Sequence, residues 1–190
     1  GCCPGDLQLI VLTHGDIDHS GNASYLRDTY GAPIAMHRGD TAMCLTDGVT
    51  RPRDTRVPDD FPKILYLWFA LAMLRYLRMK LTRSDVFEPF TPDILLDDGQ
   101  DLASLGLDAV VYHTPGHSKG SICLLTPNGD LFCGDEFGQI WGRIISSRDD
   151  PDFPSTKAKL RGLEVRRVYP GHGDAFDAQR TGLWLAGLNS

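Results

Sequence analysis

The sequence predicts an α/β or α+β fold in one layered domain, and three observations support this prediction. The chain has 190 residues, which is the length of one ordinary domain. Its residues are 42% hydrophobic and 23% charged, which is enough apolar material for a sizeable core. Strand-like runs occur both before and after helical patterns, without an internal repeat or low-complexity tract. We therefore expect a single domain over residues 1–190.

The N-terminal part begins with a strand, a polar loop, a helix and a second strand. Leu7–Leu12 is a nearly continuous β-prone run, typical of a strand that is covered on both faces. Thr13–Gly21 is polar and shows neither helical nor strand period, so we expect a loop there. Asn22 can cap a helix that runs through Tyr30. Ala32–Met36 then predicts a short strand.

The middle of the chain differs in composition from both ends. Gly48–Pro62 is rich in Pro, Arg and Asp, as expected of an exposed connection. Lys63–Leu81 carries Leu, Trp, Phe, Met and Tyr at helical density, which predicts a helix that is buried on more than one side. We therefore expect a helical insertion at about residues 48–92, in which this helix contacts the core or another subunit. A substrate lid and a membrane-surface helix are the alternatives.

The second half of the chain is rich in predicted strands. Pro127–Asp130 contains Asn-Gly, the strongest short hairpin signal, between two of these strands. A helix around Thr156–Leu160 is followed by a strand at Val165–Tyr169. The other strands expected in this half are Ile94–Leu96, Ala109–Tyr112, Ser121–Leu125 and Leu131–Cys133.

Charge and cysteine content exclude several classes of protein. Nineteen Lys and Arg against 25 Asp and Glu give a net charge of -6, which argues against a nucleic-acid partner. Five cysteines without framework spacing argue against a disulfide scaffold and favour a reducing compartment. The apolar run Ile64–Leu74 is shorter than the about 20 residues that a membrane span needs, and no signal peptide is visible. We expect a cytoplasmic protein that acts on a small-molecule substrate, without stable membrane insertion.

Four glycine-flanked loops carry the chemistry, and each follows a β-prone run. Their sequences are THGDIDHSG, HTPGHS, CGDEFG and YPGHGD, and together they hold five of the six histidines. Layered folds place polar loops at strand ends, where the loops can converge without disturbing the packed sheets. Imidazole and carboxylate groups together suit Zn²⁺, Fe or Mn, so these loops predict a metal centre.

The four loops resemble the motifs of the metallo-β-lactamase superfamily. That family has H-x-H-x-D-H, a distant His in a TPGH-type loop, an Asp in a GD loop and a final His within PGHG. This chain reads HGDIDH at 14–19, TPGH at 114–117, CGD at 133–135 and PGHG at 170–173, in the family's order. The resemblance implies an α+β fold, arranged as a four-layer αββα sandwich. It also implies that the first strands of the N-terminal half are lacking, because the first motif usually follows several strands. Exposed strand edges would then favour a homo-oligomer.

The resemblance implies two divalent metal ions, with Zn²⁺ as the first expectation. Carried over by position, one ion would be held by His14, Asp16 and His117. The other would be held by Asp18, His19 and His172, with Asp135 bridging both ions. Asp16 departs from the family pattern, since most members have a histidine there and the flavodiiron branch has a glutamate. A carboxylate oxygen favours Fe or Mn relative to Zn²⁺. The alternative is that Asp16 is not a ligand and that only the second site fills.

The implied activity is that of a metallo-hydrolase. A metal-bridging hydroxide would cleave an ester, thioester or lactone-type bond of a small, partly apolar substrate. Asp18 would be the catalytic residue, orienting the water and shuttling its proton. Substrate-binding residues are not assigned. The alternatives are a di-iron redox protein resembling the flavodiiron branch and a non-catalytic metal-binding member of the fold.

Three other residues have structural expectations. His113 matches no ligand position, and we expect it to be a buried or hydrogen-bonded structural residue. We expect His37, in a polar stretch, at the surface. Cys133 is expected to act as a small buried hydrophobic residue and not as a nucleophile.

Overall fold

The computed structural model describes residues 3–46, 87–140, 143–146 and 151–181. The chain divides into two units, one formed by Gly1–Val49 with Glu88–Ser190 and the other by Thr50–Phe87. The predicted helix at Lys63–Leu81 lies outside the described residues. So does the predicted insertion at about 48–92, apart from residues 87–92, which form no regular element. The single-domain organisation stays a prediction, and the description below concerns the first unit.

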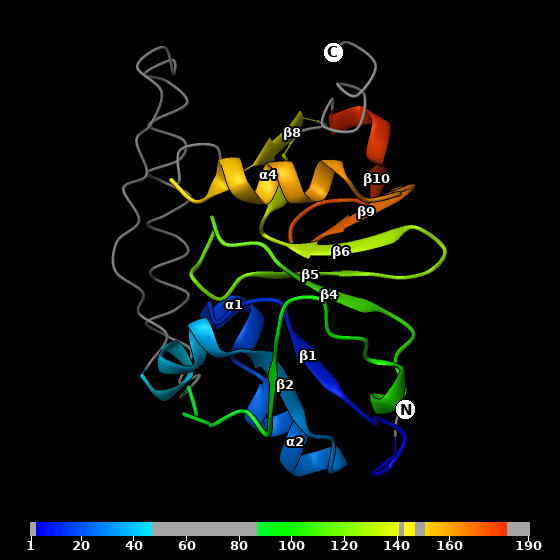
Figure 1. Cartoon of the computed structure of the whole chain (residues 1–190). Coiled ribbons are helices and arrows are strands. Elements are labelled where there is room, and N and C mark those ends of the chain that lie inside the picture. The colour runs from blue at the N-terminus through cyan, green and yellow to red at the C-terminus, as the bar shows by residue number, and fades with distance from the viewer. Residues whose placement is uncertain (1–2, 47–86, 141–142, 147–150, 182–190) are drawn as a thin grey trace. The chain divides into compact units, whose positions relative to one another are not determined.

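The first sheet contains three parallel strands in the order β1-β2-β3. These strands are β1 (Ile10–Leu12), β2 (Ile34–His37) and β3 (Ile94–Leu96). A parallel pair needs a crossover connection, and α2 (Ala23–Tyr30) provides it between β1 and β2 (Figure 1). All four residues of β2 are buried, as expected of a central strand that is covered on both faces.

The second sheet contains five strands in the order β10-β9-β6-β5-β4. The predicted hairpin at Asn-Gly is confirmed, since β5 and β6 are antiparallel neighbours. β6 pairs with β9 in parallel, and the other pairs are antiparallel. A separate antiparallel ribbon joins β7 (Phe137–Ile140) and β8 (Arg143–Ser146). The strands of the large sheet are β4 (Val110–His113), β5 (Ile122–Leu125), β6 (Asp130–Gly134), β9 (Arg167–Pro170) and β10 (Phe176–Asp177).

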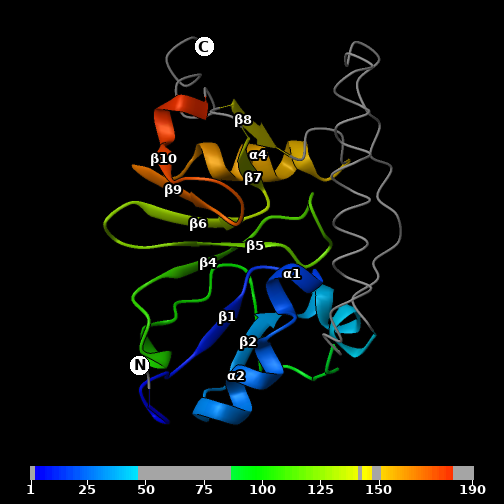
Figure 2. The same ribbon diagram turned by 180° about the vertical axis from the view of Figure 1, so that it is seen from behind.

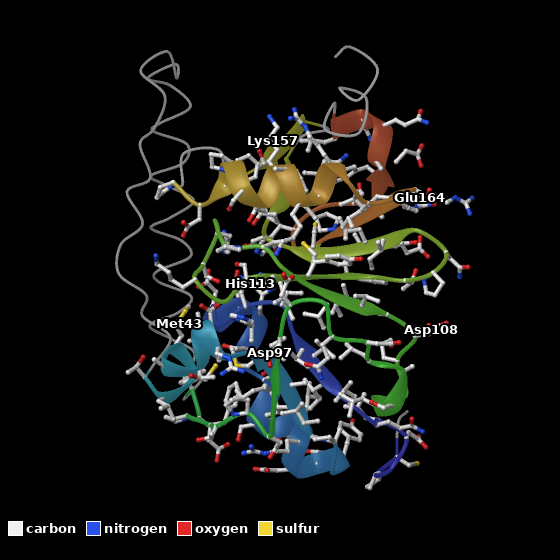
Figure 3. All side chains as sticks on the ribbon, in the orientation of Figure 1. Met43, Asp97, Asp108, His113, Lys157 and Glu164 are labelled. Atoms are coloured by element: carbon white, nitrogen blue, oxygen red, sulfur yellow. The ribbon has the colours of Figure 1, made fainter. Side chains whose placement is uncertain are left out.

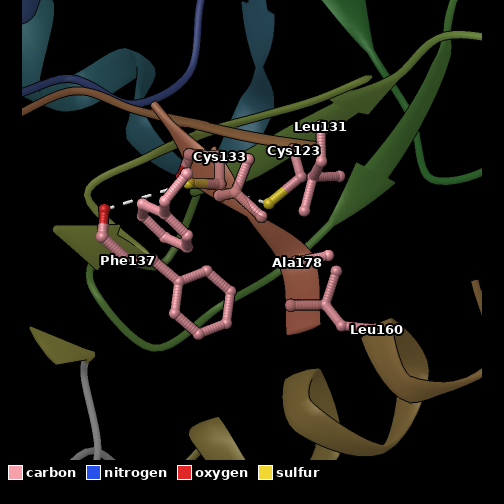
Figure 4. Packing of buried hydrophobic residues seen from close by; sticks show 8 residues of the cluster. Cys123, Leu131, Cys133, Phe137, Leu160 and Ala178 are labelled. Atoms are coloured by element: carbon pink, nitrogen blue, oxygen red, sulfur yellow. Dashed lines mark hydrogen bonds between the residues drawn. The ribbon is translucent and has the colours of Figure 1, made fainter. Parts of the chain in front are cut away.

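Two apolar clusters show how the layers stack. One joins Ala35 and Leu96 of the small sheet to Val111 and Ile122 of the large sheet, so the two sheets pack face to face. The other joins Leu160 of α4 (Phe153–Arg161) to the opposite face of the large sheet through the residues shown in Figure 4. Helix α2 lies beside the small sheet in both views (Figures 1 and 2). The α+β class and the αββα layering are thus confirmed, whereas the incomplete N-terminal half stays a prediction.

The short elements were harder to predict than the long ones. The expected loop Thr13–Gly21 contains a single helical turn, α1 (Ile17–Ser20), which is too short to show a helical period. Helix α4 begins three residues before the predicted start and includes a proline in its first turn. A proline is tolerated there because the N–H groups of the first turn have no hydrogen-bond partner within the helix. Three 3₁₀ segments were not predicted: η1 (Arg38–Leu45), η2 (Ala103–Leu105) and η3 (Ala178–Thr181).

The topology brings four strand ends to one edge of the molecule. Strands β4, β6 and β9 all run in the same direction, because β5 is antiparallel to β4 and β6, and β9 is parallel to β6. Their carboxyl ends therefore share an edge. The end of β1 is attached there by a hydrogen bond of 2.8 Å from the Ile122 N–H to the Thr13 carbonyl. The four loops with conspicuous polar motifs follow these four strand ends.

Candidate metal centre

The first group of converging side chains is His14, Asp16 and His117. Asp16 Oδ2 lies 3.2 Å from His117 Nε2 and 3.7 Å from His14 Nε2. His14 and Asp16 follow β1, whereas His117 belongs to the loop after β4. His14 is 1% exposed, and the other two side chains are each 14% exposed. This group is therefore largely shielded from solvent.

The second group is Asp18, His19 and His172. Asp18 and His19 lie on α1, and His172 lies in the loop after β9. His172 Nε2 is 3.1 Å from Asp18 Oδ2 and 3.3 Å from His19 Nε2. The side chains of His172 and Asp18 are 57% and 49% exposed. In contrast to the first group, this one is open to solvent.

Asp135 lies between the two groups. Its Oδ1 is 3.3 Å from His19 Nε2. Its Oδ2 is 3.5 Å from the Nε2 atoms of both His117 and His172, and 4.0 Å from His14 Nε2. One carboxylate thus faces an imidazole from each of the three other loops. The structure brings together all seven residues that the sequence predicts as ligands: His14, Asp16, Asp18, His19, His117, Asp135 and His172.

The close approach of the loops depends on Gly171. A Cβ at this position would collide with His19 Cε1 and would lie 2.5 Å from Asp135 Oδ1. The backbone of the PGHG loop also donates a hydrogen bond of 2.7 Å from the Gly171 N–H to the Gly134 carbonyl. Any larger residue at 171 would push the His172 loop away from Asp135.

The electrostatics of the centre suit cation binding. Burial, together with the neighbouring His19 and His117, lowers the pKa of His14 to about 4, so its ring is neutral at neutral pH. The contact with Asp135 raises the pKa of His19, against the effect of burial. Burial by itself raises the pKa of Asp135, but the close contact with His19 and its charge outweigh burial, and the pKa is lowered. The Asp135 carboxylate therefore faces the neutral His14 imidazole, with Oδ2 4.0 Å from Nε2.

His14 Nε2 provides a direct test of whether a metal fits. This atom is buried and has no hydrogen-bond partner among the described residues, while Nδ1 of the same ring lies 3.1 Å from Thr13 Oγ1. A buried polar atom without a partner is costly unless something else binds it. A divalent cation held between His14 Nε2 and the nearby Asp16 and Asp135 carboxylates would satisfy it. The donor set is one that Zn²⁺, Fe or Mn accepts.

The structure contradicts one expectation for the remaining histidines. His37 is buried, not at the surface, and its ring stacks on His113 with centroids 3.9 Å apart. The ends of the neighbouring β2 and β4 bring these rings together, which the sequence around His37 does not reveal. His113, labelled in Figure 3, lies 2.9 Å from the Lys119 carbonyl through Nε2, as expected of a hydrogen-bonded structural residue.

Two supporting residues near the centre were not singled out from the sequence. Thr156 of α4 donates a hydrogen bond of 2.6 Å to the Pro115 carbonyl, next to the His117 loop. Asp40, at the start of η1, accepts hydrogen bonds from the loops on either side of it. The run Arg38-Gly39-Asp40 after a predicted strand is only a weak sequence indication that Asp40 joins these loops. Cys133 is buried, as expected, and burial raises the pKa of its thiol to about 12.

Comparison with known proteins identifies the family. Residues 3–172 match the metallo-β-lactamase superfamily. The uncharacterised protein Rv2581c of Mycobacterium tuberculosis H37Rv is 31% identical over 180 residues, covering 87% of this chain and 69% of that protein. The acyl-coenzyme A thioesterase MBLAC2 of Homo sapiens is 32% identical over 181 residues, covering 90% of this chain and 58% of that protein. The chain thus spans little more than half of the human relative.

Solved structures share the fold. The metallo-β-lactamase family protein TTHA1429 of Thermus thermophilus superposes with a TM-score of 0.63 at 23% identity, covering 99% of this chain and 62% of that one. TTHA1623, solved in a di-iron-bound form, gives a TM-score of 0.59 at 23% identity, covering 95% of this chain and 74% of that one. Among the described residues, no helix has the length and apolar character of a membrane span. Because the family match covers most of the sequence and extends to His172, the chain belongs to the metallo-β-lactamase superfamily.

Proposed function

We propose that this chain is a metal-dependent hydrolase that cleaves the thioester bond of a small, partly apolar acyl substrate. The observation that carries the proposal is the convergence of seven imidazole and carboxylate side chains from four loops, with the buried His14 Nε2 aimed into the cluster. The thioester is chosen among ester, thioester and lactone bonds because the human, bovine and chicken relatives are named acyl-coenzyme A thioesterases.

Two divalent cations would be held by the two groups of side chains. His14, Asp16 and His117 would hold one ion, Asp18, His19 and His172 the other, and Asp135 both. Bound there, such ions lower the pKa of water from 15.7 to about 7 and stabilise negative charge on a carbonyl oxygen. Zn²⁺ is the first candidate, and the Asp16 carboxylate makes Fe and Mn the alternatives.

Asp18 is the residue that we place in contact with the reacting atoms. Its carboxylate is half exposed at the open side of the centre, where a substrate can approach. Oδ2 can accept the proton of the attacking water while the new carbon–oxygen bond forms. The same oxygen can return that proton to the thiolate when the carbon–sulfur bond breaks. The neighbouring His172 Nε2 lies 3.1 Å from Oδ2, so both groups would face the same ion.

A panel of substrates tests the proposal on the chain loaded with Zn²⁺, Fe²⁺ or Mn²⁺ in parallel. The panel contains an acyl-coenzyme A, an aryl ester, a lactone and a phosphodiester. We expect thioester cleavage that is lost on chelation and regained on adding metal. Bound metal without hydrolysis of any compound would instead indicate a non-catalytic member. Oxygen consumption by the iron-loaded chain would indicate the di-iron redox alternative.

A further inference from the structure

Asp40 is a buried carboxylate beside the candidate metal centre. Its side chain is 1% exposed and lies in η1, directly after the end of β2. Oδ2 accepts a hydrogen bond of 3.0 Å from the Gly15 N–H and one of 2.5 Å from the Ser118 hydroxyl. Oδ1 accepts one of 2.7 Å from the Gly120 N–H. Both carboxylate oxygens are thus occupied by donors from other segments.

The donors to Asp40 belong to the two loops that carry the first group of metal donors. Gly15 lies between His14 and Asp16, and Ser118 directly follows His117. His117 is 101 residues from Asp16 in the chain, and this one carboxylate joins their two loops. Moving the carboxylate would therefore change the separation of His14 and Asp16 from His117.

Asp40 fixes the direction of the Ser118 hydroxyl, and this in turn fixes the direction of the Ser121 hydroxyl. Ser118 has one hydroxyl proton and donates it to Asp40. The Ser118 and Ser121 hydroxyl oxygens are 2.7 Å apart, so Ser121 must be the donor in that pair. Ser121 Oγ in turn accepts from the Ser118 N–H at 3.0 Å. The hydrogen-bond chain ends at Asp40 and holds the His117 loop in one conformation.

Close packing leaves little room for another arrangement. A Cβ on Gly120 would lie 2.5 Å from the Asp40 backbone nitrogen and 2.7 Å from Asp40 Cγ. A Cβ on Gly15 would lie 2.9 Å from Cβ of Met43, which is labelled in Figure 3. The backbones of both loops therefore touch η1 directly, and no side chain separates them from the carboxylate.

The second group is attached to Asp40 on one side only, through the loop of Gly15 that continues into α1 with Asp18 and His19. Among the described residues, no hydrogen bond joins Asp40 to Asp18, His19 or His172. Asp40 thus contacts both loops of the first group, whereas of the second group it contacts only the loop that leads into α1.

We propose that Asp40 is a positioning residue, which holds the two loops so that His14, Asp16 and His117 face one cation. The proposal rests on the metal centre of the proposed function, but not on its substrate. An amide at this position keeps the shape of the side chain, yet it cannot accept from all three donors. Residues that orient metal ligands typically contribute about 10–100-fold to metal affinity. Asp40→Asn should weaken binding of the first ion by that order and weaken binding of the second ion less.

Zn²⁺ titration of the chelator-stripped full chain tests the proposal, with calorimetry for affinity and Co²⁺ absorption for ligand geometry. His117→Ala and His172→Ala provide reference spectra for loss of the first and the second group. Asp40→Asn should reproduce the loss seen in His117→Ala. Asp97→Asn is the matched control, because Asp97 is exposed and pairs only with Arg38 among the described contacts that involve its carboxylate oxygens. Its two Zn²⁺ affinities should equal those of the wild type.

Several outcomes would overturn the proposal. Wild-type Zn²⁺ affinities in a folded Asp40→Asn variant would do so, as would equal weakening of both ions. If Asp40→Asn does not fold, Ser118→Ala decides: a smaller weakening of the same ion supports the role, and unchanged binding refutes it. Normal Zn²⁺ binding by the wild type without thioester cleavage would refute the proposed function alone. If the wild type binds a single ion, the proposal of a two-ion centre is refuted. The positioning role of Asp40 is then supported if Asp40→Asn binds that ion more weakly, and refuted if it binds it equally well.

Discussion

His172 Nε2 lies 3.1 Å from Asp18 Oδ2, although 154 positions separate the two residues in the chain. Both side chains are about half exposed, whereas His14 on the other side of Asp135 is 1% exposed. The candidate centre is therefore asymmetric, with a buried group and an open group that share one carboxylate. Solvent reaches the open group directly, and variants of the two groups should therefore differ in their effect on folding.

Replacing His172 by Gln should remove one of two bound metal ions. The open group then keeps only Asp18, His19 and the shared Asp135, whereas the buried group keeps all its donors. Because the side chain is more than half exposed, the free energy of unfolding of the chelated protein should change by no more than about 0.5 kcal/mol. Elemental analysis and urea denaturation measure the two quantities. Asp174→Asn, in an exposed part of the same loop, should keep both ions. Retention of both ions by His172→Gln would contradict the assignment of this ligand.

Replacing Asp135 by Asn should weaken both ions together. Its carboxylate faces His14, His19, His117 and His172, so losing its charge affects both groups. We expect fewer than one equivalent of Zn²⁺ after desalting, measured by elemental analysis. Asp130→Asn at the other end of β6 is the control and should keep the wild-type content. One full equivalent in Asp135→Asn would mean that this carboxylate serves only one ion.

The seven candidate ligands could be predicted from the sequence because each belongs to a short motif with fixed spacing. Asp40 could not, since its importance depends on which backbone N–H groups fold against it, and these lie 25 and 80 positions away. The same reason explains the error at His37, whose burial depends on the neighbouring β4. Long-range pairing decides such positions, whereas strands such as Ile94–Leu96 are evident from local composition.

Replacing Asp16 by His should shift the metal preference of the buried group. Asp16 Oδ2 lies within 3.7 Å of both His14 Nε2 and His117 Nε2, so the new donor would be a third imidazole. Neutral nitrogen donors favour Zn²⁺ relative to Mn²⁺ more strongly than carboxylate oxygens do. Competition between Zn²⁺ and Mn²⁺, followed by elemental analysis, should show a higher Zn to Mn ratio in the variant. An unchanged ratio would indicate that Asp16 does not bind the ion.

Replacing Thr156 by Val should destabilise the chelated protein and disturb the His117 loop. The Thr156 side chain is buried, and its hydroxyl donates to the Pro115 carbonyl, two residues before His117. Valine has almost the same shape but no donor, so the cost is that of a buried carbonyl without its partner, about 1–3 kcal/mol. Urea denaturation measures this loss.

Ser155→Ala separates this effect from general damage to α4. Ser155 is adjacent on the same helix, and its hydroxyl bonds the Asp152 carbonyl at an exposed site. That variant should lose no more than about 0.5 kcal/mol and should keep full Zn²⁺ affinity. Thr156→Val should in addition bind the ion of the buried group more weakly, because Pro115 and His117 share one loop. Equal stability losses in the two variants would show that the hydrogen bond to Pro115 has no special part in holding the His117 loop.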